Sequence, residues 1–109
     1  MPRRAKPHPL AKAIGRRIRE LRLEAGLTLE KLAYESELGS KGYLSDIESG
    51  LALPSLKTLA VLADHLGLLL LDLVTFPAES ERQQFIDHTR GLSSAGIRRL
   101  FKETASGER

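Results

Sequence analysis

Basic side chains that could bind phosphate are concentrated in the first fifth of the sequence. Up to residue 22, eight lysines and arginines face the single acid Glu20, so this part carries +7 and the remainder −4, within a total of +3. The basic residues are Arg3, Arg4, Lys6, Lys12, Arg16, Arg17, Arg19 and Arg22. A basic segment on a mildly acidic body indicates contact with a polyanion, although a solvated arm and helix face would have the same composition.

Catalytic and metal-binding chemistry has little support in the sequence. The three histidines, His8, His65 and His88, are far apart and lack the spacing of a metal-binding pair. There is no cysteine, which excludes disulfide bonds, thiolate zinc sites and a cysteine nucleophile. No glycine-rich phosphate loop or nucleophile elbow is present. We therefore expect no enzyme activity, no catalytic residue, no cofactor and no bound metal.

Neither a membrane span nor a signal peptide is indicated. The longest apolar run, residues 68–71, is followed at once by Asp72, far short of the ~20 residues that a membrane-spanning helix needs. The segment from Pro2 to Pro9 is basic and rich in proline, unlike the apolar stretch of a signal peptide. We expect a cytoplasmic protein with no membrane partner.

Hydrophobic residues recur at helical spacing from Leu10 onward. Leu10, Ile14, Ile18 and Leu21 are three or four residues apart, with arginines between them, which predicts an amphipathic helix. Capping residues and glycines predict further helices after Thr28, Ser40, Ser55 and Ser93, and over residues 68–74 and about 79–90. No strand-like alternation is present, so we predict an all-α fold.

The composition divides the chain into three parts. Residues 1–9, with three prolines and no hydrophobic periodicity, are predicted to form a flexible basic arm. Residues 10–76 form the main helical domain, and Phe76-Pro77 marks its end. Residues 77–109 form a C-terminal helical extension with a frayed tail. Its apolar residues are too few for a core of its own, so we expect it to pack on the domain or on a second copy of the chain.

Two short helices joined by a tight turn form the most informative pattern. They cover residues 28–33 and 40–50, and such a pair can lay its second helix in the major groove of DNA while the first crosses the backbone. Residues 14–74 resemble the phage-repressor (Cro/repressor, XRE-type) helix-turn-helix family. The matching segments are residues 18–22, 26–28, 32–33, 43–50, 54–59 and 66–67. The resemblance implies a five-helix, repressor-like DNA-binding domain over residues 10–76.

The sequence departs from the family pattern at two places. The turn between the two helices is one residue longer than usual, and Gly39 is the natural surplus. Leu29 stands where the family often has a glutamine that touches phosphate. The backbone amides at that helix start, together with the Thr28 hydroxyl, could still hold a phosphate.

The resemblance implies that the first exposed positions of the second helix read bases. These positions are Ser40, Lys41, Gly42, Ser45 and Asp46. Lys41 can donate to guanine O6 or N7, although a phosphate contact or a free surface lysine is an equal alternative. Gly42 would allow close approach to the bases or simply belong to the tight turn. Asp46 could accept from cytosine N4, but phosphate would repel it.

Phosphate contacts are expected from seven residues. They are Arg3, Arg4, Arg16, Arg17, Thr28, Tyr43 and Ser49. The charges of Lys41, Asp46 and Glu48 on the second helix sum to −1, so affinity would have to come from the arm, the first helix and the helix starts. The arm could enter the minor groove or be a disordered tail, and Tyr43 could equally pack at the edge of the core.

Arg22 and Glu48 have a different expected role. By resemblance they occupy the positions of a family ion pair that links the first helix to the end of the second helix of the motif. The implied role is structural, since the pair would fix the orientation of that helix.

The predicted function is sequence-specific regulation of transcription. We expect a homodimeric repressor that binds double-stranded DNA with the helix at residues 40–49 in the major groove. The alternative is a helix-turn-helix fold used as a protein-interaction or antitoxin-type module, with a protein partner. The acidic residues Glu35, Glu37, Asp46 and Glu48 near the expected DNA face motivate this alternative.

Overall fold

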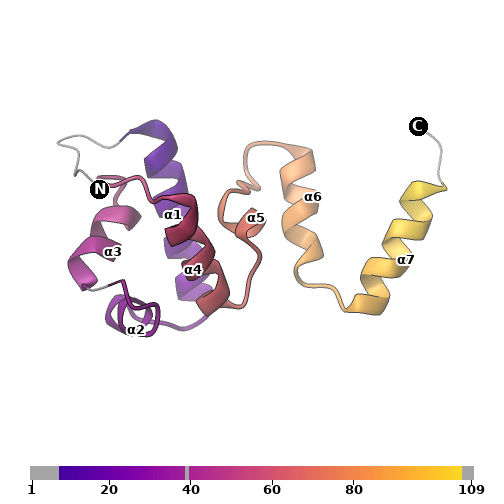
Figure 1. Cartoon of the computed structure of the whole chain (residues 1–109). Helices are drawn as coiled ribbons and strands as arrows, with labels where there is room; N and C mark the ends of the chain where they lie inside the picture. Colours follow the sequence, from indigo (N-terminus) through magenta and orange to yellow (C-terminus); the bar gives the residue numbers. More distant parts are fainter. Residues whose placement is uncertain (1–7, 39, 107–109) are drawn as a thin grey trace. The chain divides into compact units, whose positions relative to one another are not determined.

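All regular elements in the described part of the chain are α-helices, which confirms the predicted all-α class (Figure 1). The structure, a computed structural model, describes residues 8–38 and 40–106. The helices are α1 (Pro9–Glu24), α2 (Leu29–Glu35), α3 (Lys41–Glu48), α4 (Leu56–Leu66), α5 (Leu70–Leu73), α6 (Glu81–Thr89) and α7 (Ser94–Ala105). The chain divides into two compact units, one ending at Thr75 and the other beginning at Phe76.

Most helices begin at a serine or threonine that caps the first turn. The hydroxyls of the N-cap residues accept hydrogen bonds from backbone amides of the first turn, which otherwise lack a partner within the helix. These residues are Thr28, Ser40, Ser55, Ser80 and Ser93. α1 begins at Pro9, one residue before the predicted start, because the Nδ1 atom of His8 accepts from the amide of Leu10 at 3.2 Å.

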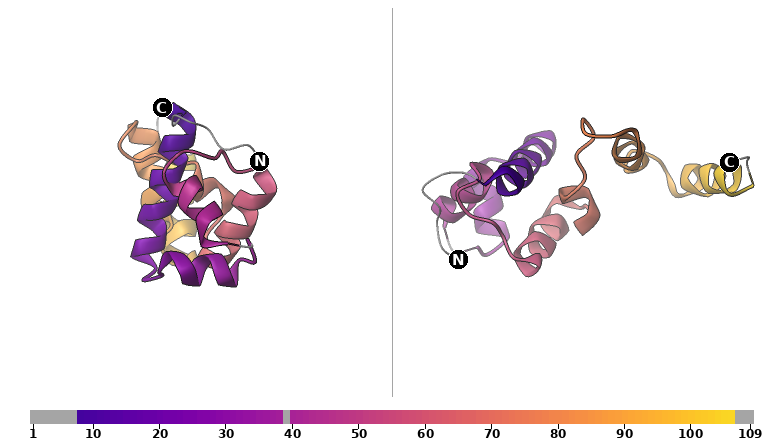
Figure 2. Two further views of the ribbon diagram at one scale, coloured as in Figure 1. Left: turned by 90° about the vertical axis from the view of Figure 1, so that its left-hand side faces the viewer. Right: turned by 90° about the horizontal axis from the view of Figure 1, so that it is seen from above.

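The core of the first unit is built from apolar side chains of all five of its helices. The largest fully buried apolar side chains are Ile18, Leu32, Leu44, Ile47, Leu62 and Leu73. α1 packs against α3 and α5, α3 packs against α2, and α4 packs against α5 and α2. Figure 2 shows these helices from two further sides. Leu10 belongs to the apolar stripe of α1 by spacing, but it is half exposed in the first turn of the helix.

α1 and the end of α3 approach each other closely at Gly15. A Cβ atom on Gly15 would lie 2.7 Å from the carbonyl oxygen of Glu48, and closer still to that of Ile47. A Cβ atom on Gly50 would lie 2.8 Å from the Cα atom of Lys12. Since carbon atoms do not pack at such distances, only glycine at both positions lets the C-terminal turn of α3 rest on α1.

The second unit contains α6 and α7, neither of which has a fully buried residue. Their largest exposed apolar side chains are Phe85, Ile97 and Phe101. Ile97 and Phe101 are four residues apart in α7 and therefore lie on one face of it. None of the helices in the described ranges is long and apolar enough to cross a membrane.

Candidate nucleic-acid interface

α2 and α3 pack against each other and are joined by a short turn, which is the arrangement that the sequence predicts for residues 28–50 (Figure 1). Leu32 on α2 and the pair Leu44 and Ile47 on α3 are fully buried. The latter two are three residues apart, so they fix one face of α3 in the core. The opposite face of α3 is left toward solvent.

The predicted base-contacting residues lie on this outer face. Ser40, Lys41, Gly42 and Ser45 are exposed, and Asp46 is half-buried. Four of the five positions are therefore accessible to a ligand. Apart from Lys41 and Asp46, their side chains are small, so a duplex could come close to the helix backbone.

Two serines at the ends of α3 also hold its backbone. The Ser40 Oγ accepts from the amide of Tyr43 at 3.2 Å, which caps the start of the helix. The Ser49 hydroxyl donates to the carbonyl of Ser45 at 2.9 Å. Both residues are exposed, so each hydroxyl oxygen can still accept a hydrogen bond from a ligand.

Lys41, in the first turn of α3, is paired with an acidic residue of α2. Its Nζ lies 3.4 Å from the Oε2 of Glu30. The carboxylate of Glu30 also accepts from its own backbone amide, and these two hydrogen bonds, the backbone one first, lower the pKa of Glu30. Glu30 is ionised at neutral pH, and its carboxylate lies against the ammonium group of Lys41, which the sequence predicts to contact a base.

Arg22 connects three parts of the first unit through one guanidinium group. Its Nε and Nη2 donate to the two carboxylate oxygens of Glu48 at 2.7 and 3.0 Å, and its Nη1 donates to the carbonyl of Leu27 at 2.7 Å. The hydrogen bond to Glu48 raises the pKa of Arg22 against the lowering effect of burial. This is the ion pair that the resemblance implies, and it joins α1 to the last residue of α3.

The residues expected to contact phosphate differ in their exposure to solvent. Arg16 and Thr28 are exposed, and Tyr43 is half-buried. The Thr28 hydroxyl accepts from the amide of Lys31 at 3.0 Å and so caps α2. Arg3 and Arg4 lie outside the described residues.

Arg17 does not have the exposed position expected of a phosphate contact. It is only 5% exposed, and its Nε donates to the carbonyl oxygen of Asp72 at 2.9 Å. The reason is its place on α1, because Arg17 is three residues after Ile14 and four before Leu21, within the apolar stripe. The structure therefore assigns Arg17 to the contact between α1 and α5.

The turn between α2 and α3 contains a left-handed residue that is not a glycine. Glu37 has a φ of 56°, a conformation that costs an L-residue with a side chain free energy. Gly39, which the sequence suggests as the surplus residue of this turn, lies outside the described residues.

Three features of this region are absent from the sequence-based predictions, namely the pairing of Glu30, the close packing at Gly15 and the positive φ of Glu37. Glu30 pairs with Lys41 across a separation of eleven residues, which no short-range spacing rule reveals. Gly15 lies in the interior of α1. Glycine is unfavourable there, so its presence is a sequence signal for close packing against another element. Glu37 carries no sequence signal for a positive φ.

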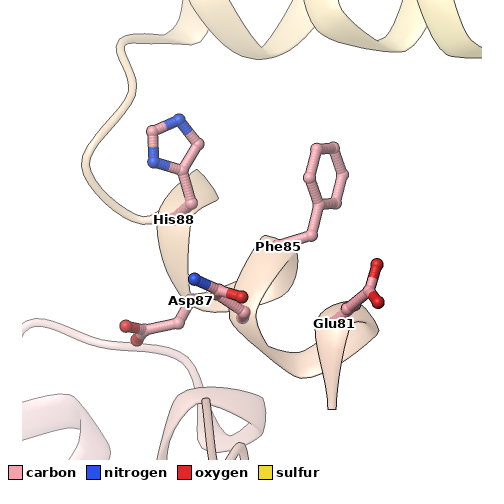
Figure 3. A pocket seen from close by; sticks show the side chains of 5 residues that line it. Glu81, Phe85, Asp87 and His88 are labelled. Carbon is pink, nitrogen blue, oxygen red and sulfur yellow. The ribbon is translucent and has the colours of Figure 1, made fainter. Parts of the chain in front are cut away.

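The second unit has a hollow on α6 lined by Glu81, Gln84, Phe85, Asp87 and His88. Figure 3 shows that Glu81, Phe85 and His88 project to one side of the helix, whereas Asp87 projects to another. Asp87 is engaged with Arg90 at 2.7 Å. Within the described ranges, no three histidine or carboxylate side chains gather closely enough to hold a metal ion.

The chain is similar in sequence and in structure to known helix-turn-helix proteins. A family described as "Helix-turn-helix domain" matches residues 13–74. The chain is 39% identical over 92 residues to the HTH-type transcriptional regulator DdrOP3 of Deinococcus deserti, a match that covers 84% of this chain. The chain spans 66% of the length of DdrOP3. The crystal structure of the clp gene regulator ClgR from C. glutamicum is similar, with a TM-score of 0.58 and 35% identity over 65% of this chain and 90% of that one.

Proposed function

Since the chain belongs to the helix-turn-helix domain family, we propose that it is a sequence-specific DNA-binding regulator of transcription. Helix-turn-helix regulators act by binding DNA and catalyse no reaction, in agreement with the prediction that this chain is not an enzyme. The observation that carries the proposal is the outer face of α3, which presents Ser40, Lys41, Gly42 and Ser45 to solvent while Leu44 and Ile47 hold the helix in the core. We propose that this face enters the major groove.

The roles of individual residues follow from their exposure. Lys41 would donate to guanine O6 or N7, and Ser40, Gly42, Ser45 and Asp46 would lie along the neighbouring base edges. Phosphates would be held by residues around this face, three of them exposed and Tyr43 half-buried. We assign that role to Arg16, Thr28, Tyr43 and Ser49. Arg3 and Arg4 are proposed phosphate contacts on charge alone.

We propose that the regulator is a homodimer and acts as a repressor in the cytoplasm. A two-fold dimer would read two half-sites about one helical turn apart. The apolar side chains of Phe85, Ile97 and Phe101 are 46%, 39% and 72% exposed, and a second copy would remove them from water. Phe101→Glu should then convert the dimer to a monomer in sedimentation equilibrium, and an unchanged mass would contradict this role of α7.

Selection of bound sites from random duplexes tests the central proposal. The chain should enrich a near-palindromic site, and its affinity should fall steeply with salt, since each phosphate contact contributes about 0.9 to the log–log slope. Lys41→Ala should lower the affinity for the selected duplex roughly tenfold, about 1.4 kcal/mol. Lys102→Ala, which removes the same charge from α7, is the matched control. Failure to enrich any site would contradict the proposed function.

A second candidate function is binding of a protein partner through the same face. Glu35 and Glu37 are exposed beside α3, and their charge opposes contact with phosphate. Glu48 does not contribute, because Arg22 holds it. One stoichiometric protein partner, together with DNA binding that has no sequence preference, would favour this antitoxin-type module over a regulator.

A further inference from the structure

The ion pair between Lys41 and Glu30 lies on the surface that would meet DNA. The Nζ of Lys41 and the Oε2 of Glu30 are 3.4 Å apart, and their side chains are 59% and 67% exposed. The pair connects the first turn of α2 to the first turn of α3. A pair with this exposure contributes little to folding stability, so any effect of Glu30 is to be sought in what Lys41 binds.

The position of Glu30 affects what Lys41 can bind. In free solution the carboxylate neutralises the ammonium group at close range. Near DNA, the same carboxylate repels any phosphate that comes within reach of Lys41, because like charges a few ångströms apart repel each other. A phosphate at this position therefore gains less from Lys41 than it would from an unpaired lysine.

Base acceptors differ from phosphates in this respect. Guanine O6 and N7 are neutral acceptors in the floor of the major groove, so Glu30 does not repel them as it repels an anion. The exposed pair is also easily exchanged, since little stability is lost when Lys41 leaves Glu30. Glu30 thus weakens binding of Lys41 to phosphate more than it weakens binding of Lys41 to a base acceptor.

We propose that Glu30 is a specificity-determining residue of the DNA interface, which suppresses binding of Lys41 to phosphate and so restricts its contribution to sites with a base acceptor. This inference rests on the proposed function, since it requires α3 to lie in the major groove. It assigns to Glu30 a role in discrimination between sequences. The residue makes no favourable contact with DNA itself.

The test is Glu30→Gln, which removes the charge and keeps the size of the side chain. The probes are the duplex obtained by random-site selection and a shuffled duplex of the same length and composition. Binding of the shuffled duplex should tighten about three- to tenfold, and its salt slope should steepen by about 0.9, because Lys41 gains a phosphate contact. Affinity for the selected duplex should change less than about twofold, so selectivity falls.

Glu35→Gln is the matched control. Glu35 is on the same helix, is exposed, and pairs with Lys31 at 4.0 Å, so its substitution removes the same charge without freeing Lys41. It should change the affinities for both duplexes by the same factor. In the double variant Glu30→Gln, Lys41→Gln, the gain for the shuffled duplex should disappear.

Two outcomes would overturn the role of Glu30. One is an equal change of both affinities in Glu30→Gln, which would make Glu30 a general surface charge. The other is a gain for the shuffled duplex that persists without Lys41. If the wild-type chain itself prefers no duplex, the proposed function fails, and that result is separate because it involves no variant.

Discussion

Arg22 and Glu48 form a doubly hydrogen-bonded ion pair that joins α1 to the end of α3, with donor–acceptor distances of 2.7 and 3.0 Å. The side chains are only 7% and 5% exposed. The same guanidinium donates to the carbonyl of Leu27, in the connection between α1 and α2. One side chain therefore holds both the end of α3 and the connection that leads into α2 against α1.

Removal of one partner of this pair should destabilise the protein strongly. Glu48→Ala leaves the buried guanidinium of Arg22 without its carboxylate, and we expect the free energy of unfolding to fall by about 3 kcal/mol. Urea denaturation measures the change. Glu35→Ala removes an exposed carboxylate and should cost less than about 1 kcal/mol. Equal losses in the two variants would contradict the structural role of the Arg22–Glu48 pair.

Because α1 and α3 approach closely at Gly15, even a methyl side chain at this position should lower the free energy of unfolding strongly. Gly15→Ala places a Cβ atom against the carbonyl oxygens of Ile47 and Glu48, so α3 must move, and we expect a loss of at least about 2 kcal/mol. Gly42→Ala is the control, because the nearest atom to its added Cβ is the Ser40 Oγ at 3.8 Å.

Thermal or urea unfolding should therefore separate the two glycines. Gly42→Ala should stabilise the protein by up to about 1 kcal/mol, because alanine has the higher helix propensity. If Gly15→Ala were as stable as Gly42→Ala, α1 and α3 could not be as close in solution as they are in this structure.

The turn between α2 and α3 should become more stable with a glycine. Glu37 has a φ of 56°, and glycine adopts this conformation without the steric cost of a Cβ atom. Glu37→Gly should raise the free energy of unfolding by about 0.5–1 kcal/mol after the greater flexibility of the unfolded chain is considered. Lys31→Gly, within α2, should instead lose about 1 kcal/mol. Destabilisation by Glu37→Gly would contradict the left-handed conformation.

The helix starts and the motif were predictable because they depend on short-range chemistry. Thr28, Ser40 and Ser55 were each recognised as caps before an apolar run, and each accepts a backbone hydrogen bond in the first turn. A cap and its partner are only three residues apart, so the sequence contains the whole interaction. The Arg22–Glu48 pair, 26 residues apart, was expected only through the family resemblance.

Contacts between residues far apart in the sequence could not be predicted from it. The charge of the first helix predicts Arg17 as a phosphate contact, yet its spacing from Ile14 and Leu21 puts it on the buried stripe. Burial is tolerated because the carbonyl of Asp72, 55 residues away, accepts its hydrogen bond. The pairing of Glu30 with Lys41 likewise depends on how α2 crosses α3.

The titration of Glu30 should reveal its contact with Lys41 in solution. Its pKa lies below the ordinary value of 4.5, first because of its own backbone amide and then because of Lys41. Since the folded state favours the ionised form, the stabilising effect is present above the ordinary value and is lost as the pH falls through the lowered pKa. An NMR titration should show the midpoint rising part of the way in Lys41→Gln, because the backbone hydrogen bond is kept. An unchanged midpoint would contradict the contact.

Arg16 and Arg17 are neighbours on α1, but their substitution should affect different properties. Arg17 should matter for folding stability and Arg16 for DNA binding. Arg17→Met removes the donor to the carbonyl of Asp72, so we expect a loss of about 1–3 kcal/mol in stability and no change in the salt slope of DNA binding. Arg16 is exposed, so Arg16→Met should leave stability within about 0.5 kcal/mol and reduce the slope by about 0.9. Urea denaturation and fluorescence anisotropy over a range of salt concentrations measure the two effects. A reduced slope in folded Arg17→Met, with no change in Arg16→Met, would return the phosphate contact to Arg17.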